Sequence, residues 1–356
     1  MSETPPHTRI VNCHIHTFTT DHSPLYFPHR IVAIFRLMPF LVRALRWLFG
    51  WLPWDNAYDF LARMENFHRT GSRANQADVF REVRHYYPSD TRFVVLPMDM
   101  ELIGQGPVNK PLRSQHDELA ELRDRYPDNV IPFATVFPDR PEAMEEFRRC
   151  VEALGFCGLK LYTKLGFAPD HPMLMEQAYP YCVAHDLPVM AHCSRGGVYG
   201  KGWTPEMRDA VTEPRAWRGV LEQFPDLRVC LAHFGGDTDW RDYIKTGFDP
   251  ERPEQKHNNW VWQICDMITS GDYGNLYTDI SYTMFKFADY APLLRLFLED
   301  EAIRDRVLFG SDFYMTRQEH LSEKEVSIRL RDALGEARFH QIAEVNPERY
   351  LGARCR

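Results

Sequence analysis

The sequence lacks the patterns that mark several large classes of protein. It contains no run of lysine and arginine, and its formal net charge of −8 argues against a nucleic-acid-binding surface. No uncharged apolar run reaches the roughly 18–20 residues that a membrane-spanning helix needs. No G-x-G-x-x-G turn follows the first apolar strand pattern, and Gly235-Gly236 does not complete one, so dinucleotide binding is not indicated. We therefore expect no nucleic-acid partner and no transmembrane segment.

Cysteine pairs and a signal peptide are also missing. None of the eight cysteines stands in a C-x-x-C pair, and several lie inside apolar runs such as Pro188–Cys193. We expect them to be reduced core residues of a cytoplasmic protein. The polar stretch Met1–Thr8 carries no apolar signal-peptide region, which agrees with that expectation.

What the sequence does contain is a regular alternation of short apolar strands and helical patterns. Eight strands are predicted, at residues 10–16, 91–98, 130–137, 158–162, 188–193, 228–233, 276–281 and 306–312. Helices are predicted at 77–87, 111–126, 140–154, 174–185, 213–224, 258–269, 290–300, 322–334 and 338–351. Alternation on this scale predicts parallel strands with crossover helices. Eight units favour a closed (β/α)8 TIM barrel of the α/β class, and 356 residues fit one such domain, 1–356, with an insertion.

The expected insertion is apolar and helical and follows the first strand, at about residues 25–75. Its apolar part, Tyr26–Trp54, is rich in Phe, Leu, Trp and Pro and is interrupted by Arg36, Arg43 and Arg46. Three interpretations remain open: an extra helical layer or oligomer contact, a lid over a substrate pocket, and a membrane-surface helix. The first of these makes a homodimer one of the expected states.

Ionisable side chains stand at five of the predicted strands, at or near their ends. On a regular strand His14 and His16 face one side, whereas Cys13 and Ile15 face the other. By the same alternation Cys193 faces away from His192. A barrel carries its chemistry where its strands end, and an ionisable residue buried there costs free energy unless something compensates it. The six residues concerned are His14, His16, Lys160, His192, His233 and Asp312. Packing explains such a set poorly, and two imidazoles on one strand face suit a metal ion.

Several short motifs follow one another along the chain and carry a family resemblance. They are His14-Ile15-His16, Gly158-Leu159-Lys160, His192, His233-Phe234-Gly235-Gly236, Gly310-Ser311-Asp312 and the ending Asn346–Gly352. Together they resemble the metal-dependent hydrolases of the amidohydrolase superfamily, in the branch called amidohydrolase family 2. That branch also contains decarboxylases and hydratases related to aminocarboxymuconate semialdehyde decarboxylase.

The resemblance implies a metal centre. One divalent ion, most often zinc, would be held by His14, His16, His192 and Asp312. His233 would stand beside the ion without necessarily binding it. Imidazole with carboxylate suits several metals, so manganese and iron stay open.

Lys160 admits three interpretations. An ammonium cannot ligate a cation, but a Lys160 carboxylated by CO2 could bridge two metal ions, as in binuclear relatives. Otherwise the ammonium could bind a carboxylate or phosphate of the substrate, or it could form a structural ion pair. Two metal equivalents per chain that are lost in Lys160→Ala would favour the bridge.

The expected reaction is hydrolysis of a small amide, lactone or other carbonyl compound by a metal-activated water. Asp312 would take a proton from that water and pass it to the leaving group. His233 would donate a hydrogen bond to the carbonyl oxygen. Substrate contacts are expected from Lys160, Arg195, Tyr162, His171 and Tyr282, with Lys164 and Trp203 as further candidates. For Arg195 the alternative is a surface salt bridge, and for the loop residues it is packing.

Two other functions compete with hydrolysis. A non-oxidative decarboxylase of a carboxylated, for instance aromatic, substrate can use an identical set of metal ligands. A binding or scaffold protein that kept the barrel without catalysis is the second alternative, and the presence of a ligand at every expected strand argues against it.

Overall fold

The structure, a computed structural model, describes residues 8–27, 69–246, 253–283, 287–318 and 322–355, together with residues 40, 44, 47, 65, 66 and 251. Most of the apolar insertion expected at about residues 25–75 lies outside the described residues, so its three interpretations remain predictions. Among the described residues no helix is both long enough and apolar enough to cross a lipid bilayer.

Within the described part of the chain, nine short parallel strands form the centre of the molecule. They are β1 (Val11–Ile15), β2 (Arg92–Val95), β3 (Val130–Pro132), β4 (Ala134–Thr135), β5 (Leu159–Leu161), β6 (Val189–Ala191), β7 (Val229–Leu231), β8 (Leu276–Asp279) and β9 (Val307–Leu308). Hydrogen bonds pair them in the order β1-β2-β3 and β4-β5-β6-β7-β8-β9. The predicted strand at residues 130–137 corresponds to β3 and β4 together, because only Phe133 separates them.

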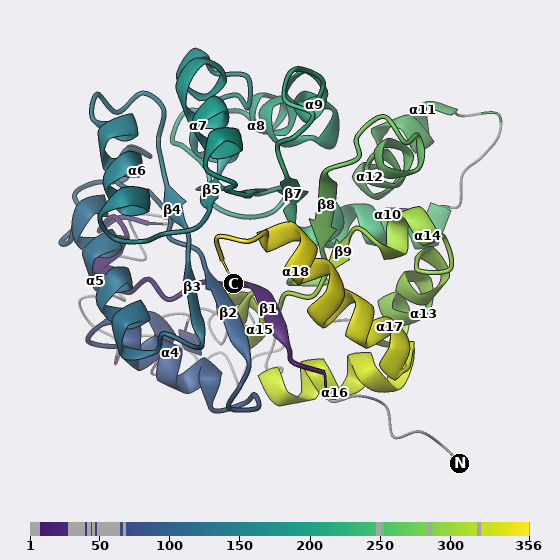
Figure 1. Ribbon diagram of the computed structural model, residues 1–356, viewed down its shortest axis with the longest axis horizontal. Coiled ribbons are helices and arrows are strands. Elements are labelled where there is room, and N and C mark those ends of the chain that lie inside the picture. The colour runs from purple at the N-terminus through teal and green to yellow at the C-terminus, as the bar shows by residue number, and fades with distance from the viewer. Residues whose placement is uncertain are drawn as a thin grey trace.

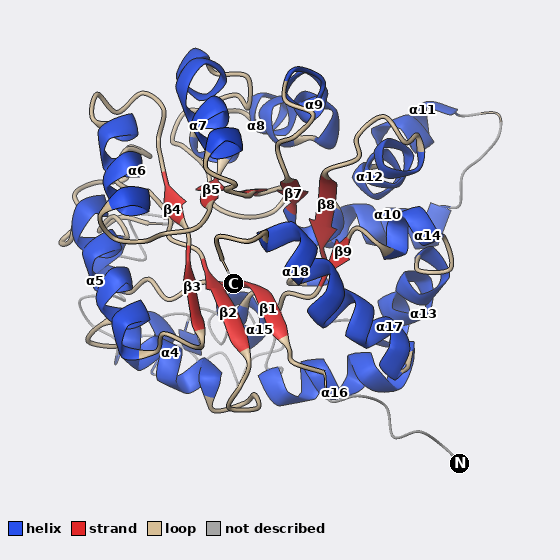
Figure 2. Ribbon diagram, in the orientation of Figure 1, coloured by secondary structure: helices blue, strands red, loops and turns tan. Residues whose placement is uncertain are grey.

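Further backbone hydrogen bonds join the two groups of strands into one ring. Between β3 and β4, the Phe133 amide donates to Val95 of β2 at 3.1 Å, and the next amide donates to Gly158 at 2.9 Å. The Cys13 amide of β1 donates to the carbonyl oxygen of Phe309, just past β9, at 2.8 Å. Figure 2 shows the strands as a ring surrounded by helices. The predicted (β/α)8 barrel is therefore confirmed.

The helices that surround the strands mostly agree with the predicted ones. These are α4 (Gln76–Arg84), α5 (Leu112–Arg125), α6 (Ala143–Glu152), α7 (Tyr179–Ala184), α9 (Arg218–Gln223), α12 (Trp260–Thr269), α13 (Phe287–Phe297), α16 (Glu323–Leu334), α17 (Glu336–His340) and α18 (Asn346–Leu351). The sequence did not predict α8 (Pro205–Thr212), α10 (Asp237–Thr246), α11 (Pro253–Asn258), α14 (Glu301–Arg304) and α15 (Phe313–Gln318). Among the described residues, side chains cap the first turns of α4, α8, α12 and α14. There Asn75, Thr204, Asn259 and Asp300 accept hydrogen bonds from backbone amides.

Side-chain alternation along the strands separates two apolar clusters. Leu159 and Leu161 of β5 pack outward against the helices, whereas Met190 of β6 and Cys230 of β7 lie inside the ring. Tyr350 and other residues near the C-terminus complete the inner cluster. Figure 1 accordingly shows the C-terminus at the centre of the strand ring.

One prediction about the first strand is wrong. Cys13 was expected to face the same side as Ile15, but Cys13 belongs to the inner cluster and Ile15 to the outer one. The reason is a register shift between Asn12 and Ile15 where β1 pairs with β2. Such an irregularity changes the direction of side chains at the end of a strand, and His14 still points into the barrel.

Candidate metal centre and active site

The six ionisable residues singled out in the sequence lie in or just past the strands and are buried. His14 and His16 lie at the end of β1, and Lys160 lies within β5. His192 directly follows β6, and His233 lies in the short 3-10 turn Ala232–Phe234 after β7. The exposed fraction is 6% or less for each of His14, His16, Lys160, His192, His233 and Asp312. Burial of this many polar groups in one region requires specific partners.

Hydrogen bonds fix the orientation of both imidazoles on β1. His14 Nδ1 lies 2.9 Å from Asp279 Oδ2, and His16 Nδ1 lies 2.7 Å from the carbonyl oxygen of Leu96. A carbonyl oxygen can only accept, and an ionised carboxylate can only accept, so each Nδ1 carries the proton. The Nε2 atom of each ring therefore keeps its lone pair, which is the form that binds a metal ion.

These lone pairs converge with a carboxylate. One ligand atom each from His14, His16 and Asp312 lies within 4.8 Å of the other two. Neither His14 Nε2 nor Asp312 Oδ1 has a hydrogen-bond partner among the described residues, although both atoms are buried. Buried donor atoms of imidazole and carboxylate that lack partners are the set that a divalent cation such as Zn²⁺ or Mn²⁺ satisfies.

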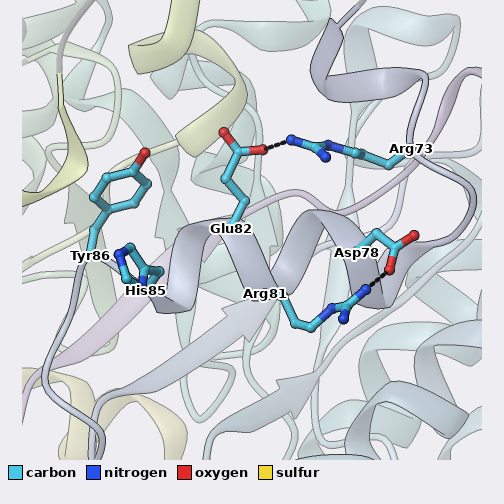
Figure 3. A pocket seen from close by; sticks show the side chains of 6 residues that line it. All are labelled: Arg73, Asp78, Arg81, Glu82, His85 and Tyr86. Atoms are coloured by element: carbon cyan, nitrogen blue, oxygen red, sulfur yellow. Dashed lines mark hydrogen bonds and ion pairs between the residues drawn. The ribbon is translucent and has the colours of Figure 1, made fainter.

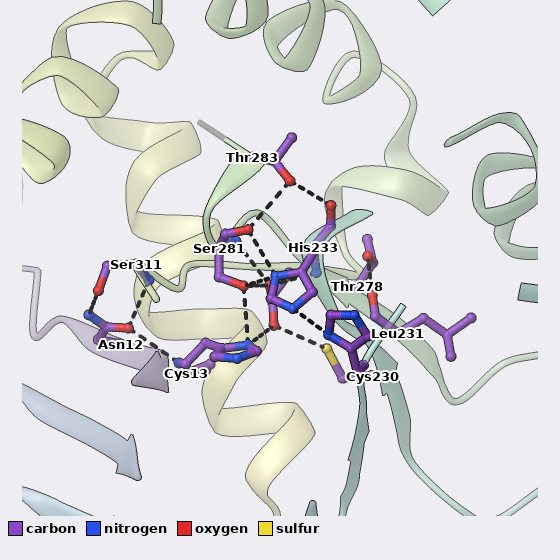
Figure 4. Close-up of polar contacts among 12 residues, drawn as sticks. Asn12, Cys13, Cys230, Leu231, His233, Thr278, Ser281, Thr283 and Ser311 are labelled. Atoms are coloured by element: carbon purple, nitrogen blue, oxygen red, sulfur yellow. Dashed lines mark hydrogen bonds and ion pairs between the residues drawn. The ribbon is translucent and has the colours of Figure 1, made fainter. Parts of the chain in front are cut away.

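His192 and His233 form a second pair of facing nitrogens. His192 Nε2 lies 3.1 Å from the carbonyl oxygen of Gly196, and His233 Nδ1 lies 3.2 Å from that of Ser281. Both of these nitrogens must donate, so His192 Nδ1 and His233 Nε2 face each other with lone pairs at 3.1 Å. Two facing lone pairs repel unless a proton or a cation lies beside them. Figure 4 shows His233 between its Ser281 contacts and the neighbouring imidazole.

Three of the four predicted ligands are thus brought into one group, and the fourth is connected to it. The His233 ring lies 4.8 Å, centroid to centroid, from both the His14 ring and the His192 ring. His192 is consequently adjacent to the group through His233 rather than within 4.8 Å of all its ligand atoms.

Burial also sets the charge state of the site. It lowers the pKa of His14, His16 and His192 below the ordinary value, and it lowers the pKa of His233 to about 3. The imidazoles are therefore neutral at pH 7, as metal ligands must be. Burial raises the pKa of Asp312 to about 7, against an opposing effect of the Lys160 ammonium.

Strained backbone is concentrated at the same end of the barrel. Among the described residues, five that are not glycine have positive φ, and four of them lie just past strands of the ring. These four are His233 (φ 69°), Phe234 (φ 44°), Tyr282 (φ 60°) and Asp312 (φ 54°). Such conformations cost about 1–3 kcal/mol each and cluster at functional sites.

Lys160 and Tyr162 lie beside the histidines. Within the described part of the chain the Lys160 Nζ atom has no hydrogen-bond partner, and its side chain is 0% exposed. Burial lowers its pKa to about 8. The Tyr162 ring stacks on His192 with a centroid distance of 4.0 Å and an interplanar angle of 9°. Its hydroxyl accepts a hydrogen bond from the Val198 amide at 3.0 Å, so Tyr162 covers one face of His192.

Arg195 is engaged by other protein groups. Its guanidinium bonds Asp239 at 2.9 Å and Asp209 at 2.5 Å. It also donates to the Asn258 carbonyl oxygen at 2.9 Å and lies 4.4 Å from the centre of the Trp260 ring. These contacts agree with the salt-bridge alternative, and a substrate contact for Arg195 remains a prediction.

The other two predicted substrate residues lie in loops. His171 Nε2 lies 3.1 Å from Asp139, and its Nδ1 accepts a hydrogen bond from the Met173 amide. Tyr282 is half-buried, and its amide donates to the carbonyl oxygen of Ser311 at 3.4 Å. A substrate contact for either residue remains a prediction.

Sequence reasoning missed Asp279 and Ser281. Asp279 ends β8 and contacts His14, while the Ser281 hydroxyl lies 3.0 Å from His233 Nδ1. The signal was present, because Asp279 is an ionisable residue near the end of the predicted strand 276–281, as Asp312 is in its own strand. What the sequence could not give was the contact across the barrel between β8 and β1.

A second group of possible ligands is already satisfied. His116 lies 2.9 Å from Glu146, and its other nitrogen accepts a hydrogen bond from the Thr135 amide at 3.3 Å. Arg149 pairs with the same carboxylate at 2.7 Å, and Cys150 Sγ lies 3.2 Å from the imidazole. The nearby guanidinium and the occupied imidazole make this group a structural network between α5 and α6.

A cavity of about 500 Å³ lies on the outer side of α4. Figure 3 shows its lining, in which Arg73 pairs with Glu82 at 2.9 Å and Arg81 pairs with Asp78. The six ionisable residues at the strands do not line it. Its arginines are already paired, so it is not the candidate active site.

Comparison with known proteins gives a family and a set of similar structures. The sequence model of the amidohydrolase family matches residues 11–353, in the branch of amidohydrolase family 2. An uncharacterised TIM-barrel protein from Bordetella bronchiseptica is 18% identical, with 97% of this chain and 99% of that chain covered and a TM-score of 0.54. A probable 2-pyrone-4,6-dicarboxylic acid hydrolase from Acinetobacter baumannii, with citric acid bound, is 14% identical, with 97% and 100% covered and a TM-score of 0.55. A 5-carboxyvanillate decarboxylase from Novosphingobium aromaticivorans, with bound manganese, is 16% identical, with 97% of each chain covered and a TM-score of 0.51.

Proposed function

This chain belongs to amidohydrolase family 2, and from that premise we propose that it is a metal-dependent hydrolase of a small carbonyl substrate that carries a carboxylate. The bond cleaved is a C–N or C–O bond at the carbonyl carbon, as in an amide or a lactone. The observation that carries the proposal is the convergence of His14, His16 and Asp312, whose ligand atoms lie within 4.8 Å of one another.

The donor atoms fit one divalent ion. We assign the ligands as His14 Nε2, His16 Nε2, His192 Nδ1 and the Asp312 carboxylate. Zinc is the first candidate and manganese the second, since imidazole with carboxylate accepts either. When bound, such an ion lowers the pKa of a coordinated water from near 16 to about 7, which supplies hydroxide at neutral pH.

Asp312 and His233 would move the protons. The Asp312 carboxylate accepts the proton that the water loses, and its buried position suits a base that works near neutral pH. His233 Nδ1 carries a proton and donates it in a hydrogen bond to the Ser281 carbonyl oxygen. Its Nε2 can therefore receive a proton and then donate it to the substrate carbonyl oxygen or to the leaving group. Asp312 is itself a proposed ligand, and the His233 ring lies 4.8 Å, centroid to centroid, from the rings of the proposed ligands His14 and His192.

Lys160 would select the substrate. A buried ammonium without a protein partner among the described residues gains free energy when an anion arrives beside it. A carboxylate or a phosphate of the substrate can be that anion, and the Tyr162 ring lies 5.9 Å from the Lys160 Nζ atom. The alternative is that Lys160 is carboxylated by CO2 and bridges two metal ions. In that case wild-type protein should hold two metal equivalents per chain, and Lys160→Ala should lose them.

Non-oxidative decarboxylation is the second candidate. The similar structures include a decarboxylase as well as a hydrolase, and the Lys160 ammonium suits the carboxylated substrate that this reaction requires. In that case the substrate loses CO2 and the same carbon takes up a proton, which Asp312 or His233 would supply.

A cytoplasmic location and a homodimer are further proposals.

One assay separates the two reactions. Protein loaded with one equivalent of Zn²⁺ or Mn²⁺ is incubated in H₂¹⁸O with lactones, amides and aromatic carboxylic acids, and both ¹⁸O incorporation and CO2 release are measured. Hydrolysis predicts ¹⁸O in the product without CO2, and decarboxylation predicts CO2 from the aromatic acids. Asp312→Asn and His233→Ala should lose turnover, while the exposed His85→Ala should not. Unchanged turnover with normal metal content in both site variants would refute the assigned roles.

A further inference from the structure

We infer that Asp279 is a positioning residue that fixes the protons of two active-site imidazoles at once, His14 and His233. The inference rests on the proposed function, in which the lone pair of His14 binds the metal ion and that of His233 takes up a proton. It concerns the tautomers of these two rings, which can be measured without a substrate.

Asp279 ends β8 and is 0% exposed. Its Oδ2 atom accepts a hydrogen bond from His14 Nδ1 at 2.9 Å. Its Oδ1 atom accepts from the His233 amide at 3.0 Å, from the Ser281 amide at 2.9 Å and from the Ser281 hydroxyl. An ionised carboxylate is costly to bury, and these four N–H and O–H donors, from the ends of β1, β7 and β8, compensate that cost.

The contact with His14 determines which nitrogen of that ring carries the proton. Because the carboxylate only accepts, the proton stays on Nδ1 and the lone pair stays on Nε2. His14 Nε2 is the buried atom that lacks a partner among the described groups. A carboxylate behind a histidine that faces a metal ion is a common way to hold the ring in its ligand form.

The contact with Ser281 extends the same control to His233. The Ser281 hydroxyl has a single proton, which it donates to Asp279 Oδ1. Its oxygen can then only accept, and it lies 3.0 Å from His233 Nδ1 and 3.1 Å from His14 Nδ1. The Ser281 carbonyl oxygen, 3.2 Å from His233 Nδ1, holds the same proton. His233 Nε2 is left with its lone pair toward His192. One buried carboxylate thereby prepares both a proposed ligand and the proposed acid–base group.

Asp279→Asn tests this reasoning, because it keeps the shape and changes one acceptor into a donor. The asparagine oxygen can still accept from the His233 and Ser281 amides, but its NH₂ group would then face His14 Nδ1. His14 would have to carry its proton on Nε2, where it cannot bind a metal ion. We expect the affinity for Zn²⁺, measured by competition with a chromophoric chelator, to fall on the order of 10- to 100-fold.

The tautomers provide a readout that a merely structural role would not change. In metal-free wild-type protein labelled with ¹⁵N-histidine, long-range ¹H–¹⁵N spectra should show His14 and His233 protonated on Nδ1. In Asp279→Asn the His14 signals should change to the form protonated on Nε2. Ser281→Ala is the matched control: it removes the hydroxyl but keeps the Ser281 carbonyl oxygen 3.2 Å from His233 Nδ1. It should therefore leave both tautomers unchanged and the Zn²⁺ affinity within twofold of wild type.

Several results would overturn the inference. A folded Asp279→Asn variant with wild-type Zn²⁺ affinity and an unchanged His14 tautomer would do so. If that variant does not fold, the wild-type spectrum decides, since a His14 proton on Nε2 contradicts the inference directly. Wild-type protein that binds no Zn²⁺ yet shows both predicted tautomers would refute the proposed function and leave the positioning role of Asp279 intact.

Discussion

Replacing Lys160 by methionine should stabilise the metal-free protein while it weakens binding of the substrate. Methionine has nearly the length of lysine and no charge to desolvate. Burial lowers the pKa of Lys160 from 10.5 to about 8. Each unit of pKa corresponds to 1.36 kcal/mol, so the charged form of Lys160 costs the fold about 3 kcal/mol at pH 7. Lys160→Met should raise the free energy of unfolding by up to about that amount.

The gain should depend on pH with a definite sign. Lys160 holds its proton less tightly in the folded protein than in the unfolded chain. Between pH 8 and 10.5 the unfolded chain therefore binds more protons, and the Lys160 contribution to stability rises with pH across that window. The advantage of Lys160→Met should be complete below pH 8 and should vanish by about pH 10.5.

Chemical denaturation of both proteins at pH 7, 9 and 10.5, with chelator present, measures this difference. Lys164→Met is the comparison variant: burial lowers the pKa of Lys164 to about 8 as well, but its ammonium donates to the Gly196 carbonyl oxygen at 2.8 Å and to two neighbouring carbonyls. Removing the ammonium leaves these buried acceptors unpaired, which costs about 1–3 kcal/mol and should offset the gain, so Lys164→Met should be less stable than Lys160→Met. A Lys160→Met protein that is less stable than wild type at pH 7, or an advantage independent of pH, would refute the reasoning.

Three further predictions concern the surroundings of the site. Gly197→Ala should lower the melting temperature and the metal affinity, because φ is 96° there and a Cβ would overlap the Tyr162 hydroxyl. Gly202→Ala is its control: φ is 89°, but a Cβ there would meet no atom within 4 Å, so only the smaller cost of backbone strain is expected. Saturation with Zn²⁺ at about 100 times its Kd should stabilise wild type by about 2.7 kcal/mol, an effect absent in His16→Ala and present in His85→Ala; equal stabilisation of both variants would count against the site. Arg195→Met should lower stability through the loss of its pairs with Asp209 and Asp239 but leave KM for a carboxylate substrate unchanged; a large rise in KM with normal stability would restore Arg195 as a substrate contact.

The barrel could be predicted because its signals are local. Each strand is a short apolar run, and each crossover helix has its own periodicity, so eight units could be counted without any tertiary contact. Short helices such as α8 and α14 escaped because their apolar faces are too brief to give a period. The insertion expected at about residues 25–75 was recognised by composition, and composition alone does not determine its position.

The site could be predicted only as a set of strand ends. The position of His14 and His192 in the sequence placed them at the correct end of the barrel, because parallel strands all end on one side. The predicted orientation of the Cys13 side chain was wrong, because the alternation of residues in the sequence does not reveal the register shift in β1. Asp279 and the ion pairs of Arg195 depend on contacts between distant segments, which single-sequence patterns do not contain.

The most direct test of the metal centre is an anomalous difference map from crystals of the protein soaked with Zn²⁺ and recorded at the zinc edge. We predict one strong peak bounded by His14 Nε2, His16 Nε2, His192 Nδ1 and the Asp312 carboxylate. A map with no peak there at full soaking, or with its only peak elsewhere, such as at His116 and Glu146, would contradict the account.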